Sequence, residues 1–120
     1  MAIEIRAGRY FSALWLVTAL GQDWLMALYR DEGETAFTLV QRFHDADDER
    51  RRWYTATLRG NEGGMPDEAA ARRLVVELIS AYRQGEQIER VEQIDLCSSD
   101  PDFILARLST VMSLKREWIH

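Results

Sequence analysis

Apolar and polar residues alternate through much of the first half of the chain, with the two-residue period of half-buried strands. In the stretch 35–43, Phe37 and Leu39 fall on one face, while threonine and arginine fall on the other. A polar segment with a glycine, 31–34, separates this stretch from the apolar run 24–30. Two such runs on either side of a glycine-containing turn predict a β-hairpin.

A further strand is predicted at 52–59, where threonine and aromatic residues are enriched. Its two alternating sets are Tyr54, Ala56 and Leu58 on one face and Trp53, Thr55 and Thr57 on the other. The charged run 45–51 then falls between two strands. We therefore predict that it is the loop of a second hairpin.

The apolar run 10–20 admits two interpretations, because a short apolar run cannot be assigned by its period alone. Its leucine and alanine favour a helix, whereas its aromatic residues, valine and threonine favour a strand. We favour a strand, which gives a four-stranded antiparallel meander. A helix here would remove one edge strand and leave the fold class unchanged.

The same run loosely imitates a signal peptide, since Arg6 and Arg9 precede it. Glu4, however, lies in what would be the basic region, and the run is well short of the roughly 20 residues that span a bilayer. We interpret it as a core element of a soluble protein.

The second half of the chain, after the glycine-rich segment 60–66, has helical spacing. Pro66 suits the first position of a helix, and acids follow it where the helix end is positive. The apolar stripe of this helix ends before Gly85 and consists of Ala71, Leu74, Val75, Leu78, Ile79 and Tyr82. The region 88–96 is weakly patterned and leaves room for a short strand around 91–96.

A second helix is predicted to begin at Ser99, with Ser99 as its cap, Pro101 at its first position and Asp102 three residues after the cap. Its apolar face comprises Ile104, Leu105, Leu108, Val111 and Met112. Lys115 and Arg116 lie near its end, where positive charge is favoured.

Strands followed by helices indicate a single α+β domain over residues 1–120, strand-rich over 1–60 and helix-rich over 65–118. We expect an antiparallel meander sheet of about four strands, packed against two C-terminal helices in two layers. A chain of 120 residues with 47% apolar and 29% charged residues is long and balanced enough to bury one core.

Charge and cysteine content narrow the function classes. A net charge of −5 disfavours a dedicated nucleic-acid-binding protein, because such domains usually carry a basic surplus. Fourteen arginines against the single Lys115 are typical of a GC-rich, bacterial coding sequence, or else of selection for guanidinium groups that pair bidentately with anions. Cys97 is the only cysteine, which fits a reducing cytoplasm, and we expect it to be a small buried side chain.

The segment 44–55 concentrates the candidate chemistry. His44 and the acids after it could ligate a metal, but the glycine of a calcium loop is missing and three arginines follow. Arg50, Arg51 and Arg52 beside Trp53 pair charge with a stacking surface, as single-strand nucleic-acid binders do. The neighbouring acids lower the local positive potential, so a solvated loop is favoured over both sites.

Motifs for catalysis are missing from the sequence: no nucleophile elbow, zinc-protease helix, phosphate loop or dinucleotide fingerprint occurs. We therefore expect no catalytic residue, no cofactor and no metal. Glu32 and Glu34 are acids in a turn, and without a pocket around them we interpret them as surface residues.

Four tryptophans are the feature least easily assigned to the core alone, because tryptophan, tyrosine and arginine carry binding energy at interfaces. We expect Trp53 to face outward beside Thr55, with Arg42 across the hairpin. The leading hypothesis is a non-enzymatic protein–protein interaction module that contacts a protein partner or a second copy through Arg42, Arg50, Arg51, Arg52, Trp53 and Thr55. The alternatives are a nucleic-acid-binding accessory protein that uses Arg50–Arg52, or a small-ligand pocket between sheet and helices, lined by Trp15 and Tyr82.

Overall fold

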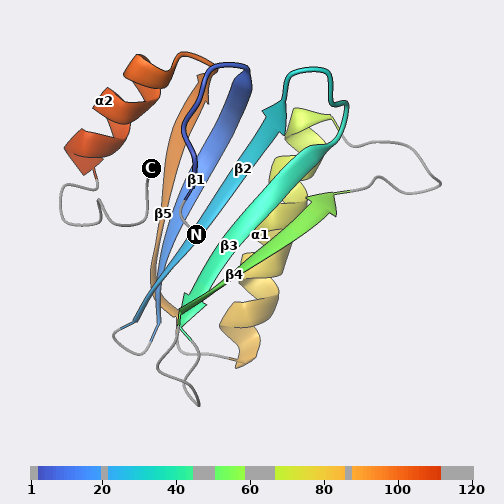
Figure 1. The fold of residues 1–120 in the computed structure, drawn as a ribbon. Helices are drawn as coiled ribbons and strands as arrows, with labels where there is room; N and C mark the ends of the chain where they lie inside the picture. Colours follow the sequence, from blue (N-terminus) through green and yellow to red (C-terminus); the bar gives the residue numbers. More distant parts are fainter. Residues whose placement is uncertain (1–2, 20–21, 45–50, 59–66, 86–87, 112–120) are drawn as a thin grey trace.

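The computed structural model describes residues 3–19, 22–44, 51–58, 67–85 and 88–111, and for residues 19, 22–23, 42–44, 51–56, 82–85 and 111 it describes the backbone alone (Figure 1). These residues form one antiparallel sheet and two helices. The α+β class predicted from the sequence is confirmed.

Five strands make up the sheet, in the order β4-β3-β2-β1-β5, and every neighbouring pair is antiparallel. The strands are β1 (Arg9–Ala19), β2 (Gln22–Asp31), β3 (Phe37–His44), β4 (Arg51–Leu58) and β5 (Ile88–Ser98). The predicted meander is present as β1 to β4. The expected number of about four strands is wrong, because β5 pairs with β1 and extends the sheet at that edge.

The run 10–20, which the sequence left between strand and helix, lies largely in β1. Its nearly continuous apolar pattern follows from its place in the sheet, since both faces of this strand are covered. Leu14 and Trp15 point to opposite faces, and each side chain is 1% exposed.

Two apolar clusters fill the two faces of the sheet. On one face, which we call the α1 side, Trp15, Met26 and Leu39 pack with Ala71 and Val75 of helix α1 (Glu68–Gly85). This layer of helix on sheet is the two-layer α+β arrangement that the sequence predicts. Leu74, expected in the buried stripe of α1, is 37% exposed instead.

Helix α2 (Pro101–Val111) lies on the other face, which we call the α2 side. There Ile104 and Leu108 pack with Leu14, Leu25 and Val40 of the sheet and with Ile94 of β5. Figure 1 shows α2 beside β5, away from α1. The expectation that both helices lie across one face therefore changes: β5 carries the chain from one face to the other.

Local caps and turns fix the ends of these elements. Asp67 accepts a hydrogen bond of 2.7 Å from the Ala70 N–H and caps α1. The cap of α2 is Asp100 rather than the predicted Ser99, because its Oδ1 accepts the Asp102 N–H at 3.0 Å. In the turn between β2 and β3, Gly33 adopts a φ of 84°, which the missing Cβ permits.

Neither α1 nor α2, the helices of the described chain, has the length and apolar run that crossing a membrane requires.

Candidate functional site

Three of the predicted surface residues are brought together by the register of the β3–β4 hairpin. Arg42 is paired with Trp53, and Thr55 is paired with Val40. Val40 belongs to the α2-side cluster, so by strand alternation these positions belong to the α2 side of the sheet. The hairpin register thus places Arg42 opposite Trp53, and the contact surface predicted from the sequence stays a prediction.

Other predicted features lie partly or wholly outside the described residues. Arg51 and Arg52 are the first two residues of β4, paired with His44 and Phe43, but their side chains are not described. Arg50, the acidic run 45–49 and the glycine-rich segment 60–66 lie outside the described chain. The predicted outward position of the Trp53 indole and the arginine contact with nucleic acid stay predictions.

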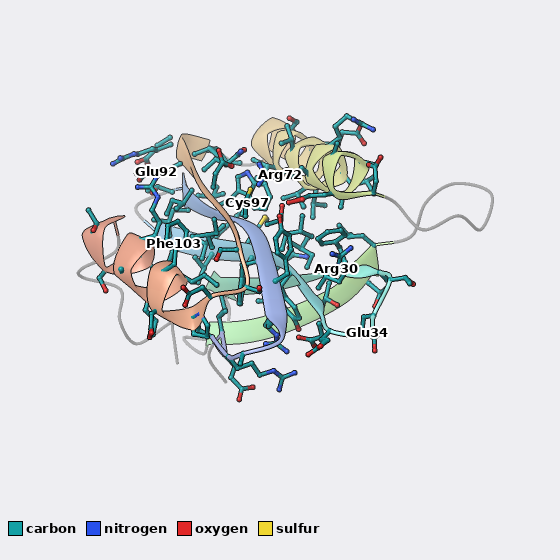
Figure 2. All side chains as sticks on the ribbon, turned by 90° about the horizontal axis from the view of Figure 1, so that it is seen from above. Arg30, Glu34, Arg72, Glu92, Cys97 and Phe103 are labelled. Carbon is teal, nitrogen blue, oxygen red and sulfur yellow. The ribbon has the colours of Figure 1, made fainter. Side chains whose placement is uncertain are left out.

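Helix α2, which packs on the α2 side of the sheet, exposes two large apolar side chains. Phe103 is 49% exposed and Leu105 is 41% exposed. The sequence assigned Leu105 to the buried face, and that expectation is wrong: Ile104 and Leu108 face the sheet, and Leu105 is turned away from it. Figure 2 shows Phe103 on α2, on the opposite side of the sheet from Arg72 of α1.

The densest polar cluster of the described chain centres on Arg72, where α1 meets β1 and β5. The Arg72 guanidinium donates from Nε to Ser12 Oγ at 2.7 Å and from Nη2 to the Ser12 carbonyl oxygen at 2.7 Å. Its Nη1 donates to Asp95 Oδ1 at 2.7 Å, and Nη2 also approaches Cys97 Sγ at 3.1 Å. Figure 2 shows Arg72 and Cys97 close together between helix and strand.

The backbone explains why a guanidinium is needed at this place. The pairing of β1 shifts register between Phe11 and Ala13 toward both neighbouring strands: Ser12 is an extra residue relative to β2, whereas toward β5 it lies opposite two residues, Leu96 and Cys97. An extra residue at a bulge leaves backbone groups without a ladder partner. Ser12 is fully buried, and Arg72 satisfies both its hydroxyl and its carbonyl oxygen.

Two further side chains extend the cluster. The Tyr10 hydroxyl donates to both carboxylate oxygens of Glu68, at 2.8 and 3.0 Å, and Glu68 lies 3.9 Å from the Arg72 guanidinium. Burial, followed by this bond to Glu68, raises the pKa of Tyr10 above its usual value. The pKa of Asp95 is lowered, mainly by the hydrogen bond that Gln93 donates to it and then by Arg72.

Cys97 differs from the expectation of a small buried side chain: it is an exposed free thiol. The reason is its place in β5, where Leu96 faces the core and Cys97 follows with a φ of 48°. That left-handed conformation is costly for a residue with a side chain, and it coincides with the register shift opposite Ser12.

All three nitrogens of the Arg72 guanidinium already donate to protein groups, so the cluster works as a structural connection between α1, β1 and β5. The guanidinium therefore has no free pair of N–H donors that could bind a substrate anion bidentately. Sequence analysis did not find this cluster. The only available signal was an arginine directly beside the apolar stripe of α1, which many solvated arginines share.

A second cationic site ties the N-terminal segment to the sheet. Arg9 is 8% exposed and donates to both carboxylate oxygens of Asp31, at 2.6 and 3.0 Å. Its guanidinium carbon lies 4.0 Å from the centroid of the Tyr29 ring, and its Nη1 donates to the Glu4 carbonyl oxygen. The hydrogen bond with Asp31 raises the pKa of Arg9 and lowers that of Asp31.

Within the described residues, histidine, cysteine and carboxylate side chains form no group that could hold a metal ion. Trp15, expected to line a ligand pocket, is instead a core side chain whose indole N–H donates to Gln93 Oε1 at 2.9 Å. Comparison of the chain with protein-family models, with curated proteins and with solved structures finds no match.

Proposed function

We propose that the protein is a cytoplasmic, non-enzymatic protein–protein interaction module that contacts its partner through the α2 side. The single observation that carries the proposal is the exposure of Phe103, at 49%, on a helix of eleven residues that also exposes Leu105. Exposed large apolar side chains, together with aromatic and arginine residues, are typical of interaction surfaces.

The β3–β4 hairpin supplies further binding-type residues on the α2 side, toward the opposite edge of the sheet from β5. Arg42 and Trp53 are opposite each other in the β3–β4 register, and Thr57, two residues beyond Thr55 on the same set of alternating positions, is exposed. Aromatic and arginine side chains at the centre of an interface contribute most of its binding energy. The proposed contact surface therefore has two parts on the α2 side: Phe103 and Leu105 of α2, and Arg42, Trp53 and Thr55 of the sheet.

The polar clusters support a binding role rather than catalysis. The Arg72 and Arg9 guanidinium groups are occupied by hydrogen bonds to Ser12 and Asp31. A general acid or base needs a free, positioned proton site, and these clusters provide packing instead. The single cysteine of the sequence agrees with a reducing compartment.

Substitution on the two faces tests the proposal. Trp53→Ala and Phe103→Ser should each weaken retention of the partner in a quantitative pull-down, or lower the molar mass seen by size-exclusion chromatography with light scattering. Val76→Ser is the matched control, because Val76 of α1 is 48% exposed on the opposite side of the molecule. A monomeric chain whose retained partners are the same for all three variants would contradict the proposal.

A further inference from the structure

At one edge of the sheet lies β5, whose outer side is not paired with any other described strand. β5 is an eleven-residue strand that pairs with β1 alone in the described sheet. Arg90 to Asp95 follow β1 without a register shift, so this part of the edge is regular. An edge strand presents a row of N–H and C=O groups that another strand can pair with.

Charges of opposite sign follow each other on one face of β5, in an order that is complementary to an antiparallel second copy of the same strand. Arg90 and Glu92 lie on one face of β5, with their charged groups 3.1 Å apart and side chains 71% and 36% exposed. An ion pair this exposed contributes little to the stability of one chain. Its sequence order, cation then anion around Val91, is the pattern that is self-complementary under a two-fold rotation.

We propose that β5 pairs antiparallel with β5 of a second copy of this chain, with Val91 on the two-fold axis. In this register Arg90 lies opposite Glu92 of the second copy, and Glu92 lies opposite Arg90 of the second copy. Both pairs are cross-strand neighbours on one face of a continuous ten-stranded sheet, counted as two sheets of five.

The two adjacent registers, with the axis at residue 90 or at residue 92, are disfavoured by charge. A two-fold axis perpendicular to the sheet keeps the α1 sides of both copies on one face. Such an axis must pass between one residue of β5 and the same residue of the second copy, which lie directly opposite each other. With the axis at residue 92, Glu92 lies opposite itself. With the axis at residue 90, Arg90 lies opposite itself. Like charges directly opposite each other destabilise strand pairing, so charge favours the axis at Val91 over these two registers.

The apolar side chains next to the axis agree with this occupant. Ile88 and Val91 are half-buried at the margin of the α1-side cluster. A second β5 would cover them. This inference goes beyond the proposed function: it concerns the sheet edge and names a second copy as the occupant there.

Charge reversal tests the register. Sedimentation equilibrium of the full chain should show a dimer for the natural sequence, weakened about tenfold by either Arg90→Glu or Glu92→Arg. The double variant R90E/E92R should return to within about threefold of the natural dissociation constant, because the swapped charges are again complementary. Arg73→Glu, an exposed change on α1, is the control and should leave the dimer unchanged.

Thermal unfolding of each variant at low concentration establishes that the single variants are folded, since they also lose the pair within the strand. A natural chain that is monomeric at the highest concentration would overturn the proposal. So would single variants that dimerise as well as the natural chain, or a double variant as weak as the singles. These results leave the α2-side surface untouched, since its test uses Trp53 and Phe103.

Discussion

Arg72 and Ser12 lie sixty positions apart, yet the Arg72 guanidinium donates two hydrogen bonds of 2.7 Å to this one serine, one to its hydroxyl and one to its carbonyl oxygen. The serine is the extra residue at a bulge in the central part of the sheet. A helix side chain thus completes the hydrogen bonding that the strands leave open, and it connects α1 to β1 and β5.

Replacing Arg72 should destabilise the fold strongly. Arg72→Ala would leave the buried Ser12 hydroxyl without its donor, the Ser12 carbonyl oxygen with only the weak donor of the Cys97 thiol, and Asp95 without its ion pair. Unpaired buried polar groups cost about 1–3 kcal/mol each, so we expect a loss of about 3 kcal/mol in the free energy of unfolding in urea. Arg73→Ala, at the exposed neighbour, should stay within about 0.5 kcal/mol. Equal losses for the two variants would refute the structural role of Arg72.

Cys97 should tolerate substitution according to backbone conformation rather than size. At a φ of 48°, glycine or asparagine fits the left-handed region, whereas a β-branched side chain is strained. Cys97→Val should therefore be less stable than Cys97→Gly by about 1–2 kcal/mol. Chemical unfolding of the two variants measures the difference directly. A Val variant as stable as the Gly variant would mean that the strand is extended here.

Asp31 should make stability depend on pH in the acid range. Its pKa is lowered in the folded protein by the hydrogen bond from Arg9, so the folded state binds fewer protons here than the unfolded chain. The contribution is complete above the unfolded pKa of about 4 and is lost as the pH falls through the lower folded pKa.

Asp31→Asn removes this contribution and leaves the buried Arg9 without its counter-charge. We expect a loss of about 2 kcal/mol at pH 7 and a gap from the natural protein that narrows below pH about 4. Urea unfolding at several pH values gives the gap, with Glu77→Gln of α1 as an exposed control. A gap that is constant with pH would contradict the assignment.

Tyr10 should make the stability of the fold depend on pH in the alkaline range. Its pKa is raised in the fold, chiefly by burial and then by the bond to Glu68, so the folded state keeps its proton longer than the unfolded chain. The resulting stability is present below the unfolded pKa of about 10 and is lost as the pH rises above it. Tyr10→Phe should cost about 1 kcal/mol at pH 8 through the lost hydrogen bond and should flatten the alkaline decline. Identical alkaline profiles would exclude this role.

The sequence predicts those elements whose pattern is local. The β2–β3 hairpin follows from alternation around Gly33, and the pairing of Arg42 with Trp53 follows from the order of the strands around the 45–50 segment. The run 10–20 is a strand because its aromatic and β-branched side chains fill both faces of the sheet. Local propensity and tertiary packing agree in these cases.

Other features depend on contacts that no local pattern records. β5 is only weakly patterned because Glu89, Arg90 and Glu92 occupy an edge, where charge is tolerated. The side on which α2 packs depends on where β5 joins the sheet. The Arg72 cluster needs the Ser12 bulge, and a register shift of that kind leaves no mark in composition or period.

The most direct measurement for the α2-side surface is site-specific photo-crosslinking in the cells that make the protein. A photoreactive amino acid at position 103, beside the exposed Leu105, should give a discrete crosslinked product with the partner. The same amino acid at position 76 of α1, which is equally exposed on the opposite side, should give none. Products from position 76 alone, or equal products from both positions, would contradict the account.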